Sequence, residues 1–471
     1  MSTRSSETHR ADNGWAIAEF DEIALGDARL ERRLWRVAEA LSGQPQYPIN
    51  QASEDAAATK AAYRLFNNES VTAEKIFLAH RARTMQRMHN EPVVLAVQDT
   101  SFFNYSRHKK TRGLGPIADK DNNAQGLIVH STLAVTPEGL PLGVLAHRCW
   151  ARQGYRAAED EHETKPIEEK ESYRWVETLR EVAKLSALHR ASMVVTVADR
   201  ESDIYEFLLE AQKLNAKYVI RACYDRHIKS DVHRTIHERL AALGVQAQVE
   251  LAQVELDVPT QSRRATLDLK FMKVDLRPPD RITRSRGSLL VTCWVIYVRE
   301  KHPPEGFESL SWTLLTNIAI ESVEQAVEKL AWYRRRWAIE EFHKILKSGC
   351  TVEDCRLQTA ERLKRYIALF CVIAWRLFWM VHIKRANPKA PAEVALTQSE
   401  IGTLRSLKRF KEKLLAPGPF TVKQAVIAIA CLGGYLNRRN DPPPGPTVLW
   451  RGWQRLSSMA ELYESVVPRC G

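Results

Sequence analysis

Apolar residues recur at helical spacing near the start of the chain. Over residues 25–41 the apolar positions fall every three or four residues, and Asp27 precedes them as a candidate N-cap. A second helix is predicted over residues 53–68, which begin at Ser53 and end in two asparagines. The apolar side of the first helix consists of Leu30, Leu34, Val37 and Leu41.

The other sides of these two helices are basic. Basic helical faces are often only solvated surfaces, but two in succession also favour contact with DNA, and both interpretations stay open at this point. The basic residues that would face DNA are Arg29, Arg33 and Arg64, and the first helix also carries Arg32 and Arg36.

Short apolar runs follow from about residue 92 and predict strands. The first run ends at Asp99, and residues 127–150 predict a hairpin that turns at a Pro-Glu-Gly sequence. A β-rich run from residue 192 ends at Asp199 and precedes a helix. Residues 217–222 predict one more strand.

Residues from about 224 to 318 differ from the segments around them in their pattern of apolar and polar positions. Two-residue alternation over 249–258, 265–276 and 288–298 predicts strands with one solvated face. This region is therefore predicted to be an all-β insertion. Helical spacing resumes at Ser322.

One segment is apolar enough to resemble a membrane span. Residues 366–383 approach the minimum of about 18 residues that spanning requires. Arg376 lies in the middle of the segment, and basic residues flank both ends, so a core helix without a membrane is the favoured interpretation.

The overall charge favours a polyanionic partner. The 471 residues include 69 Lys and Arg against 57 Asp and Glu, a net charge of +12, which is typical of nucleic-acid binding but also occurs in basic proteins without such a partner. The polar residues 1–13 predict no secretion signal. Cys350 and Cys355 are too isolated for a structural zinc site, and a reduced cytoplasm or a nucleus fits the scattered cysteines.

Asp99 and Asp199 each follow a predicted buried strand. Open sheets place ligand sites outside the carboxyl ends of their strands, and two such ends on neighbouring strands could chelate Mg²⁺ or Mn²⁺. Taken singly, an aspartate at such a position is more often a turn former or a helix cap.

Residues 332–349 offer a third carboxylate within a basic and aromatic helix. On a continuous helix four residues fall within roughly 60° of one another, whereas the neighbouring Glu341 points elsewhere and is predicted to be structural. The alternative is an exposed helix with ion pairs between successive turns. The four aligned residues are Tyr333, Arg336, Glu340 and Lys347.

These four residues form the pattern Tyr-x2-Arg-x3-Glu-x6-Lys, and the chain resembles bacterial DDE transposases of the cut-and-paste, hairpin-forming insertion-sequence type. Residues 198–203 (ADRESD) and 97–105 (VQDTSFFNY) resemble the family segments around its two aspartates. Likeness continues at residues 24–33, 61–68 and 449–456, so it covers nearly the whole chain.

The resemblance implies an α/β fold: a ribonuclease-H-like mixed-sheet core between helical ends. It implies a transposon-end DNA-binding domain at 1–78, a catalytic core at 79–386 that includes the insertion, and a dimerisation domain at 387–471. It further implies that Asp99, Asp199 and Glu340 are catalytic and bind two Mg²⁺ ions, which Mn²⁺ could replace. The DNA contacts it implies are Tyr333, Arg336, Lys347, Trp312, Arg221, His343 and Lys344.

The implied activity is DNA transposition in the cytoplasm of a bacterium, at the nucleoid and without a membrane. A homodimer would bridge two inverted-repeat ends, excise the element through hairpins and join its 3′-hydroxyls to target DNA. Two alternatives stay open: an inactive copy that binds ends and inhibits transposition, and a ribonuclease-H-like nuclease without strand transfer. A core Trp of the insertion is the alternative for Trp312, and a packing role the alternative for His343.

Overall fold

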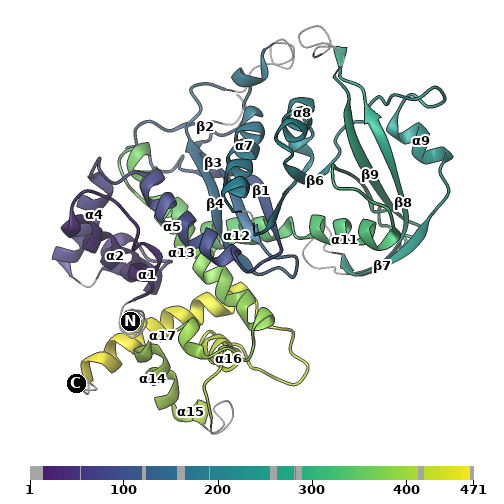
Figure 1. Ribbon diagram of the computed structural model, residues 1–471. Coiled ribbons are helices and arrows are strands. Elements are labelled where there is room, and N and C mark those ends of the chain that lie inside the picture. Colours follow the sequence, from purple (N-terminus) through teal and green to yellow (C-terminus); the bar gives the residue numbers. More distant parts are fainter. Residues whose placement is uncertain are drawn as a thin grey trace, which may run out of the picture. The chain divides into compact units, whose positions relative to one another are not determined.

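The protein is a mixed α/β protein that divides into two compact units. The computed structural model describes residues 14–53, 55–118, 123–155, 165–189, 191–254, 263–280, 282, 289–411 and 418–466 (Figure 1). Unit 1 contains Met1–Met88, Thr100–Arg156 and Ala338–Gly471, and unit 2 contains His89–Asp99 and Ala157–Trp337. The polar residues 1–13 lie outside the described part, and the three-domain division stays a prediction.

Unit 2 is built on a sheet whose first strands are parallel. The segment between β1 and β5 contributes helix α7 (Tyr173–Leu188), and α8 (Tyr205–Leu214) connects β5 to β6, which are the crossovers that parallel strands require (Figure 1). In order across the sheet the strands are β1 (Val93–Asn104, of which unit 2 holds the residues up to Asp99), β5 (Met193–Ala198), β6 (Lys217–Arg221), β10 (Ser311–Thr316), β9 (Val291–Glu300), β8 (Arg263–Leu276) and β7 (Ala247–Val254).

The predicted insertion continues this sheet. β10 pairs antiparallel with both β6 and β9, and the long strands β8 and β9 pair over ten residues from Leu267 to Leu276. Alternating burial along β9 agrees with the predicted period of two. The prediction that the insertion is all-β is wrong, because α9 (Ile236–Ala242) begins at the N-cap Thr235 and buries Ile236 and Leu240.

Unit 1 contains the helices from both ends of the sequence together with a predicted hairpin. The hairpin is confirmed, with β3 and β4 antiparallel around a turn at Gly139, whose φ of 102° suits glycine. The elements are α1 (Trp15–Glu19), α2 (Ala28–Gly43), α3 (Ile49–Ala52), α4 (Ala56–Asn67), α5 (Ala73–Met88), β2 (Gly115–Pro116), β3 (Gln125–Val135), β4 (Pro141–Trp150), α12 (Trp337–Lys344, from Ala338 on), α13 (Ala360–Ala386), α14 (Gln398–Ser406), α15 (Lys408–Lys411), α16 (Val422–Leu432) and α17 (Pro446–Val466).

The first residues of α2 and α4 test the capping residues that the sequence predicts. Asp27 caps α2 as predicted, accepting a hydrogen bond from the backbone N–H of Arg29 at 2.7 Å. The second helix begins later than predicted, at Ala56, because Asp55 rather than Ser53 accepts the capping bond. Ser53 instead ends the short helix α3.

The apolar helix α13 is a core helix, as predicted. It is long and apolar enough to cross a membrane, but 78% of its most apolar window is buried inside the protein. The guanidinium of Arg376, in its middle, lies 5.1 Å from the ring centroid of Trp15 and 5.4 Å from that of Trp453. It also donates a hydrogen bond to the carbonyl of Ala395 at 3.1 Å. Protein groups therefore replace the water that this cation would lose on burial.

A buried polar cluster joins helices α1 and α5 to strand β4 within unit 1. Arg87 donates to both carboxylate oxygens of Glu19 at 2.9 and 3.0 Å, and His80 donates to the same carboxylate at 2.5 Å. The other ring nitrogen of His80 accepts from the backbone N–H of Val144 at 2.8 Å. The Arg87 guanidinium also stacks 4.1 Å from the ring centroid of Trp375 on α13.

Glu19→Gln is expected to lower the free energy of unfolding at pH 7 by about 3 kcal/mol, because it leaves Arg87 without its buried counter-charge. Although burial raises the pKa of Glu19, His80 and Arg87 outweigh burial and lower it from 4.5 to about 2. The stabilisation is therefore present above pH 4.5 and is lost as the pH falls toward 2.

Urea unfolding of the full chain at pH 7 and at pH 4 measures both effects. Asp21→Asn is the matched control, because it breaks the surface pair between Asp21 and Arg83, and it should cost less than about 1 kcal/mol. Equal losses in the two variants would contradict a special role for the buried cluster.

Candidate active site

The parallel pairing of β1 and β5 brings the two predicted aspartates together. Val93 pairs with Met193 and the register continues to Val97 opposite Val197, so Asp99 lies on β1 two residues past the last pair and Asp199 lies two residues past it in the turn that follows β5. Buried β-branched residues hold both strands in the sheet, whereas the two aspartates are only half-buried. β1 does not end at Asp99 as predicted but continues to Asn104, while its pairing with β5 stops at Val97.

The turn after β5 fixes the backbone around Asp199. The Asp199 carboxylate accepts from the backbone N–H of Glu201 at 2.9 Å, and the hydroxyl of Ser202 donates to the Asp199 carbonyl at 2.6 Å. Arg174 on α7 forms an ion pair with Glu201. Asp199 is therefore a cap as well as a site candidate, so the two interpretations of a strand-end aspartate do not exclude each other.

Tyr333 lies at the centre of a cluster of predicted site residues in unit 2. Its ring packs edge-on against Trp312 at 5.8 Å between centroids, and its hydroxyl shares hydrogen bonds with Arg221 and Arg336. Burial raises the pKa of Tyr333, against the opposing effect of the two guanidinium groups, while the nearby Asp199 charge raises it further. The hydroxyl is therefore protonated at neutral pH and can donate.

One further hydrogen bond holds the edge of this cluster. Arg221 donates from Nη2 to the carbonyl of Ser311 at 3.3 Å, across the pairing of β6 with β10. Burial lowers the pKa of Arg221, so less water surrounds its charge than at an exposed arginine. Unit 2 thus brings together Asp99, Asp199, Arg221, Trp312, Tyr333 and Arg336.

The predicted single helix over residues 332–349 is interrupted twice. α11 (Val323–Arg334) ends in a tight turn in which the N–H of Arg336 bonds to the carbonyl of Tyr333 at 2.9 Å. α12 follows and then widens into a π-helical turn at Ile345–Gly349, labelled η4. The prediction of one continuous helix with four aligned residues is therefore wrong, and Tyr333 is buried rather than exposed on a shared helix face.

The remaining predicted residues of this segment belong to unit 1. Glu340 is half-buried in the first turn of α12, and Lys344 is exposed. The Lys347 ammonium lies 5.3 Å from the ring centroid of Phe103. His343 is buried and burial lowers its pKa to about 3, which fits the packing role considered for it better than a contact with DNA.

The chemistry of the donor set fits a hard divalent cation. Paired aspartates supply the carboxylate oxygens that Mg²⁺ and Mn²⁺ prefer, and the site adjoins three cationic or hydroxyl donors for phosphate. Within the described residues no three His, Cys, Asp or Glu side chains form a cluster that could hold a metal ion. Glu340 therefore stays a predicted third ligand. The structural role of Glu341 also stays a prediction, and its Oε2 lies 3.7 Å from Nε2 of His382.

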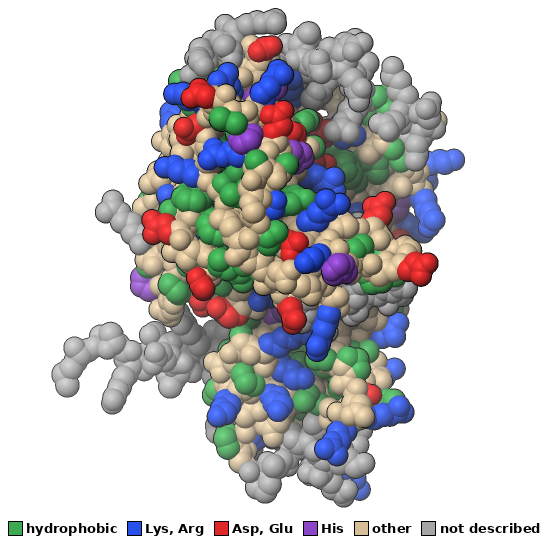
Figure 2. All heavy atoms as spheres, turned by 90° about the vertical axis from the view of Figure 1, so that its right-hand side faces the viewer, with side chains coloured by type: hydrophobic (Ala, Val, Ile, Leu, Met, Phe, Trp, Pro, Cys, Tyr) green, Lys and Arg blue, Asp and Glu red, His purple; other side chains and the backbone are tan. Residues whose placement is uncertain are grey.

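The basic residues of the N-terminal helices are accessible. Arg29 on α2 and Arg64 at the end of α4 are exposed, and Arg33 is half-buried. Elsewhere charge is mixed: Figure 2 shows Lys and Arg side chains interspersed with Asp and Glu on the face it presents. The net charge of +12 therefore does not collect in one patch on that face.

Two segments of the chain match known families. Residues 12–71 match the family described as transposase DNA-binding, and residues 159–376 match the family described as transposase DDE domain. The first range contains the basic residues of α2 and α4, and the second contains Asp199 and Glu340, whereas Asp99 precedes it. The matches support a DNA-binding transposase of the DDE class, and transposases of this class generally depend on a divalent metal.

Asp199→Asn is expected to leave the free energy of unfolding unchanged or to raise it by up to about 1 kcal/mol in EDTA. An asparagine oxygen can still accept the capping bond from Glu201, while the repulsion from Asp99 across the strand pair disappears. Asp199→Leu, which also loses the cap, is the control and should be less stable than Asp199→Asn. A clear destabilisation by Asp199→Asn would contradict net repulsion at Asp199 and would mean that attraction to the neighbouring guanidinium groups outweighs the charge of Asp99. Urea unfolding of the full chain measures all three proteins.

Proposed function

We propose that this chain is a DDE transposase that binds the terminal inverted repeats of its element, cuts the element out and joins it to target DNA. The observation that supports the proposal is the parallel pairing of β1 and β5, which ends two residues before Asp99 and two before Asp199, together with the cluster of Tyr333, Arg221 and Arg336 near Asp199. Metal-assisted phosphoryl transfer uses carboxylates that bind metal ions next to basic side chains that bind phosphate. A ribonuclease-H-like core is the fold proposed for this arrangement.

Asp99, Asp199 and Glu340 are proposed to hold a pair of Mg²⁺ ions, for which Mn²⁺ could substitute. Bound in this way, the ions would supply Lewis-acid activation of the attacking oxygen and would neutralise charge on the scissile phosphate. The carboxylates fix the place at which that chemistry occurs. Because positioning and charge supply the catalysis, no covalent protein intermediate is required.

The DNA contacts divide into two kinds. Arg221, Arg336 and Lys347 are proposed to bind phosphate oxygens near the cut, and the protonated hydroxyl of Tyr333 to donate a further hydrogen bond. Trp312 is proposed to stack on a base flipped out at the transposon end. Lys344, which is exposed, joins the phosphate contacts, and Arg29, Arg33 and Arg64 are proposed to bind the inverted repeat.

The hairpin route and the dimer are the finer part of the proposal. Their support is the resemblance of the sequence to the transposase of the composite kanamycin-resistance transposon used in tagmentation. Trp450 and Trp453 on α17 are buried within unit 1, so they are not available as surface contacts for a dimer bridging two ends. Leu462 and Val466, at the far end of α17, are 65% and 70% exposed and are the better candidates for that interface.

Two rival functions have distinct outcomes. A non-catalytic end-binding inhibitor would fail to excise an element from a donor plasmid, although both aspartates and the glutamate are present. A ribonuclease-H-like nuclease without strand transfer would cut duplexes with and without terminal repeats equally. Comparing repeat-ended and random duplexes of one length therefore separates it from a transposase.

Asp199→Asn and Glu340→Gln are each expected to bind an inverted-repeat duplex as tightly as the unsubstituted protein but to nick it more than about a hundredfold more slowly in Mg²⁺, because each variant loses the negative charge and one of the two oxygens of a proposed metal ligand. Gel shift measures binding, and a denaturing gel measures nicking. Glu341→Gln is the matched control, since it neutralises the adjacent glutamate, and it should nick normally. Full cleavage by Glu340→Gln would remove that residue from the metal site.

Arg336→Ala and Lys347→Ala are expected to slow hairpin formation by about a hundredfold and the first nick by much less, because the second step must draw the phosphate of the opposite strand toward the phosphate of the strand already cut. Denaturing gels resolve nicked and hairpin products in one time course. Arg334→Ala, which removes an exposed arginine two residues away, is the control. Equal slowing of both steps would contradict the assigned phosphate contacts.

A further inference from the structure

Asp203 is a fully buried carboxylate four residues beyond Asp199. Its side chain is 0% exposed, and it accepts hydrogen bonds from the backbone N–H groups of Cys223 and Tyr224 at 2.7 and 3.2 Å. Arg226 donates to the second carboxylate oxygen from Nε at 2.8 Å and from Nη2 at 2.6 Å. A buried charge with this many donors is costly to assemble and is well satisfied once assembled.

These bonds connect two segments that each carry a predicted site residue. Asp203 ends the short turn Arg200–Ser202 that Asp199 caps, and its own N–H bonds to the Arg200 carbonyl at 3.1 Å. The residues it holds from the other side begin at Cys223, two residues after β6 ends at Arg221. The Asp203 carboxylate therefore bridges the end of β5 and the end of β6.

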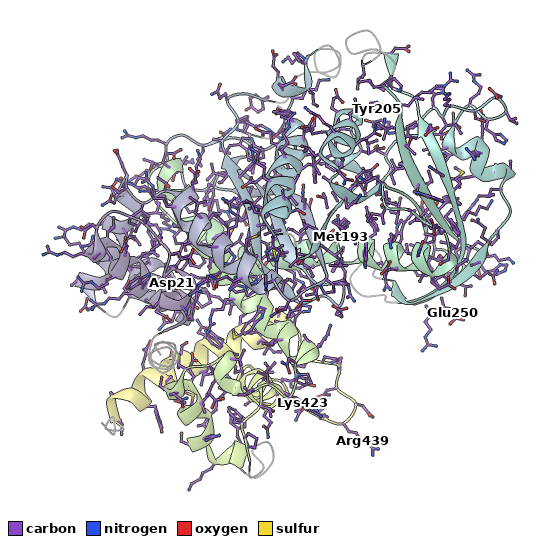
Figure 3. All side chains as sticks on the ribbon, viewed as in Figure 1. Asp21, Met193, Tyr205, Glu250, Lys423 and Arg439 are labelled. Carbon is purple, nitrogen blue, oxygen red and sulfur yellow. The ribbon has the colours of Figure 1, made fainter. Side chains whose placement is uncertain are left out.

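Further contacts prevent the bridge from moving as a whole. The Arg226 guanidinium lies 5.7 Å from the ring centroid of Tyr205. Tyr205, labelled in Figure 3, is the first residue of α8. The Tyr205 hydroxyl donates to the carbonyls of Leu276 and Leu289 at 3.0 and 2.7 Å. The backbone N–H of Ala222, next to Arg221, bonds to the Thr313 carbonyl at 2.8 Å.

We infer that Asp203 is a positioning residue that fixes the distance between the Asp199 carboxylate and the Arg221 guanidinium by clamping the β5 turn to the segment after β6. The inference rests on the proposed function, in which Asp199 binds metal and Arg221 binds phosphate. Asp203 itself touches neither group. Its loss should loosen the Asp199 turn and weaken metal binding, as the loss of a group supporting a metal ligand does.

The test is Mn²⁺ binding to the full chain, measured by electron paramagnetic resonance at a temperature at which every variant is folded by circular dichroism. The signal that Asp199→Asn removes defines binding at the proposed site. Asp203→Asn is expected to weaken this binding by about tenfold and to shift the Mg²⁺ dependence of end nicking to correspondingly higher concentration. Its affinity for the inverted-repeat duplex in EDTA should stay within about twofold.

Asp203→Asn leaves Arg226 buried without a counter-charge and could misfold for that reason alone. A second variant therefore removes the Arg226 charge as well. The double variant Asp203→Asn, Arg226→Gln is neutral at both positions and should show the same loss of Mn²⁺ affinity. Glu210→Gln is the matched control: it breaks the 2.8 Å ion pair between Arg180 on α7 and Glu210 on α8, about two helical turns from Asp203. It should bind Mn²⁺ normally.

The outcomes separate this inference from the proposed function. If Asp199→Asn abolishes nicking and a Mn²⁺ site while both Asp203 variants keep the wild-type Mn²⁺ affinity, Asp203 is a structural residue only and the inference fails. If Asp199→Asn itself nicks and binds Mn²⁺ normally, the proposed metal site fails first. A loss in Glu210→Gln equal to that in the Asp203 variants would also overturn the inference, because any lost ion pair would then suffice.

Discussion

The candidate site depends on the parallel register between β1 and β5. The side chains of a strand alternate between faces, so a shift of one residue in either strand would turn one aspartate away from the other. Five consecutive residue pairs fix the register, and the apolar residues of Val94–Val97 and Val194–Ala198 are buried in the core. The energy that holds the two carboxylates close therefore comes from hydrophobic burial a few residues away.

Much of this site could be predicted from local sequence. Asp99 and Asp199 follow apolar runs, and strand ends on one edge of a sheet are predictable from such runs alone. Spacing likewise predicted the capped helix α2 and the hairpin of β3 and β4. These features depend on neighbours within a few residues, which the sequence displays directly.

The features that could not be predicted depend on distant partners. The prediction of a single helix over residues 332–349 assumed regular helical hydrogen bonding. The tight turn at Arg336 instead accompanies the packing of Tyr333 against Trp312 and the hydrogen bond between Tyr333 and Arg221. The bridge at Asp203 joins residues 20 to 23 positions apart and gives no periodic signal. In the local sequence, the bridge is reflected only in the closely spaced charged residues of ADRESD.

The π-helical turn at Ile345–Gly349 has a consequence for how the chain tolerates changes in length. A turn of this kind holds one residue more than an α-helical turn, so it is equivalent to a single inserted residue accommodated without unwinding the helix. A deletion of one residue there would restore ordinary winding, leave Glu340 on its own turn of α12 and keep the chain beyond the turn in place, so that only residues of the turn itself, Lys347 among them, would shift. Drift in length at this point would thus alter the placement of Lys347 while sparing the carboxylate seven residues before it.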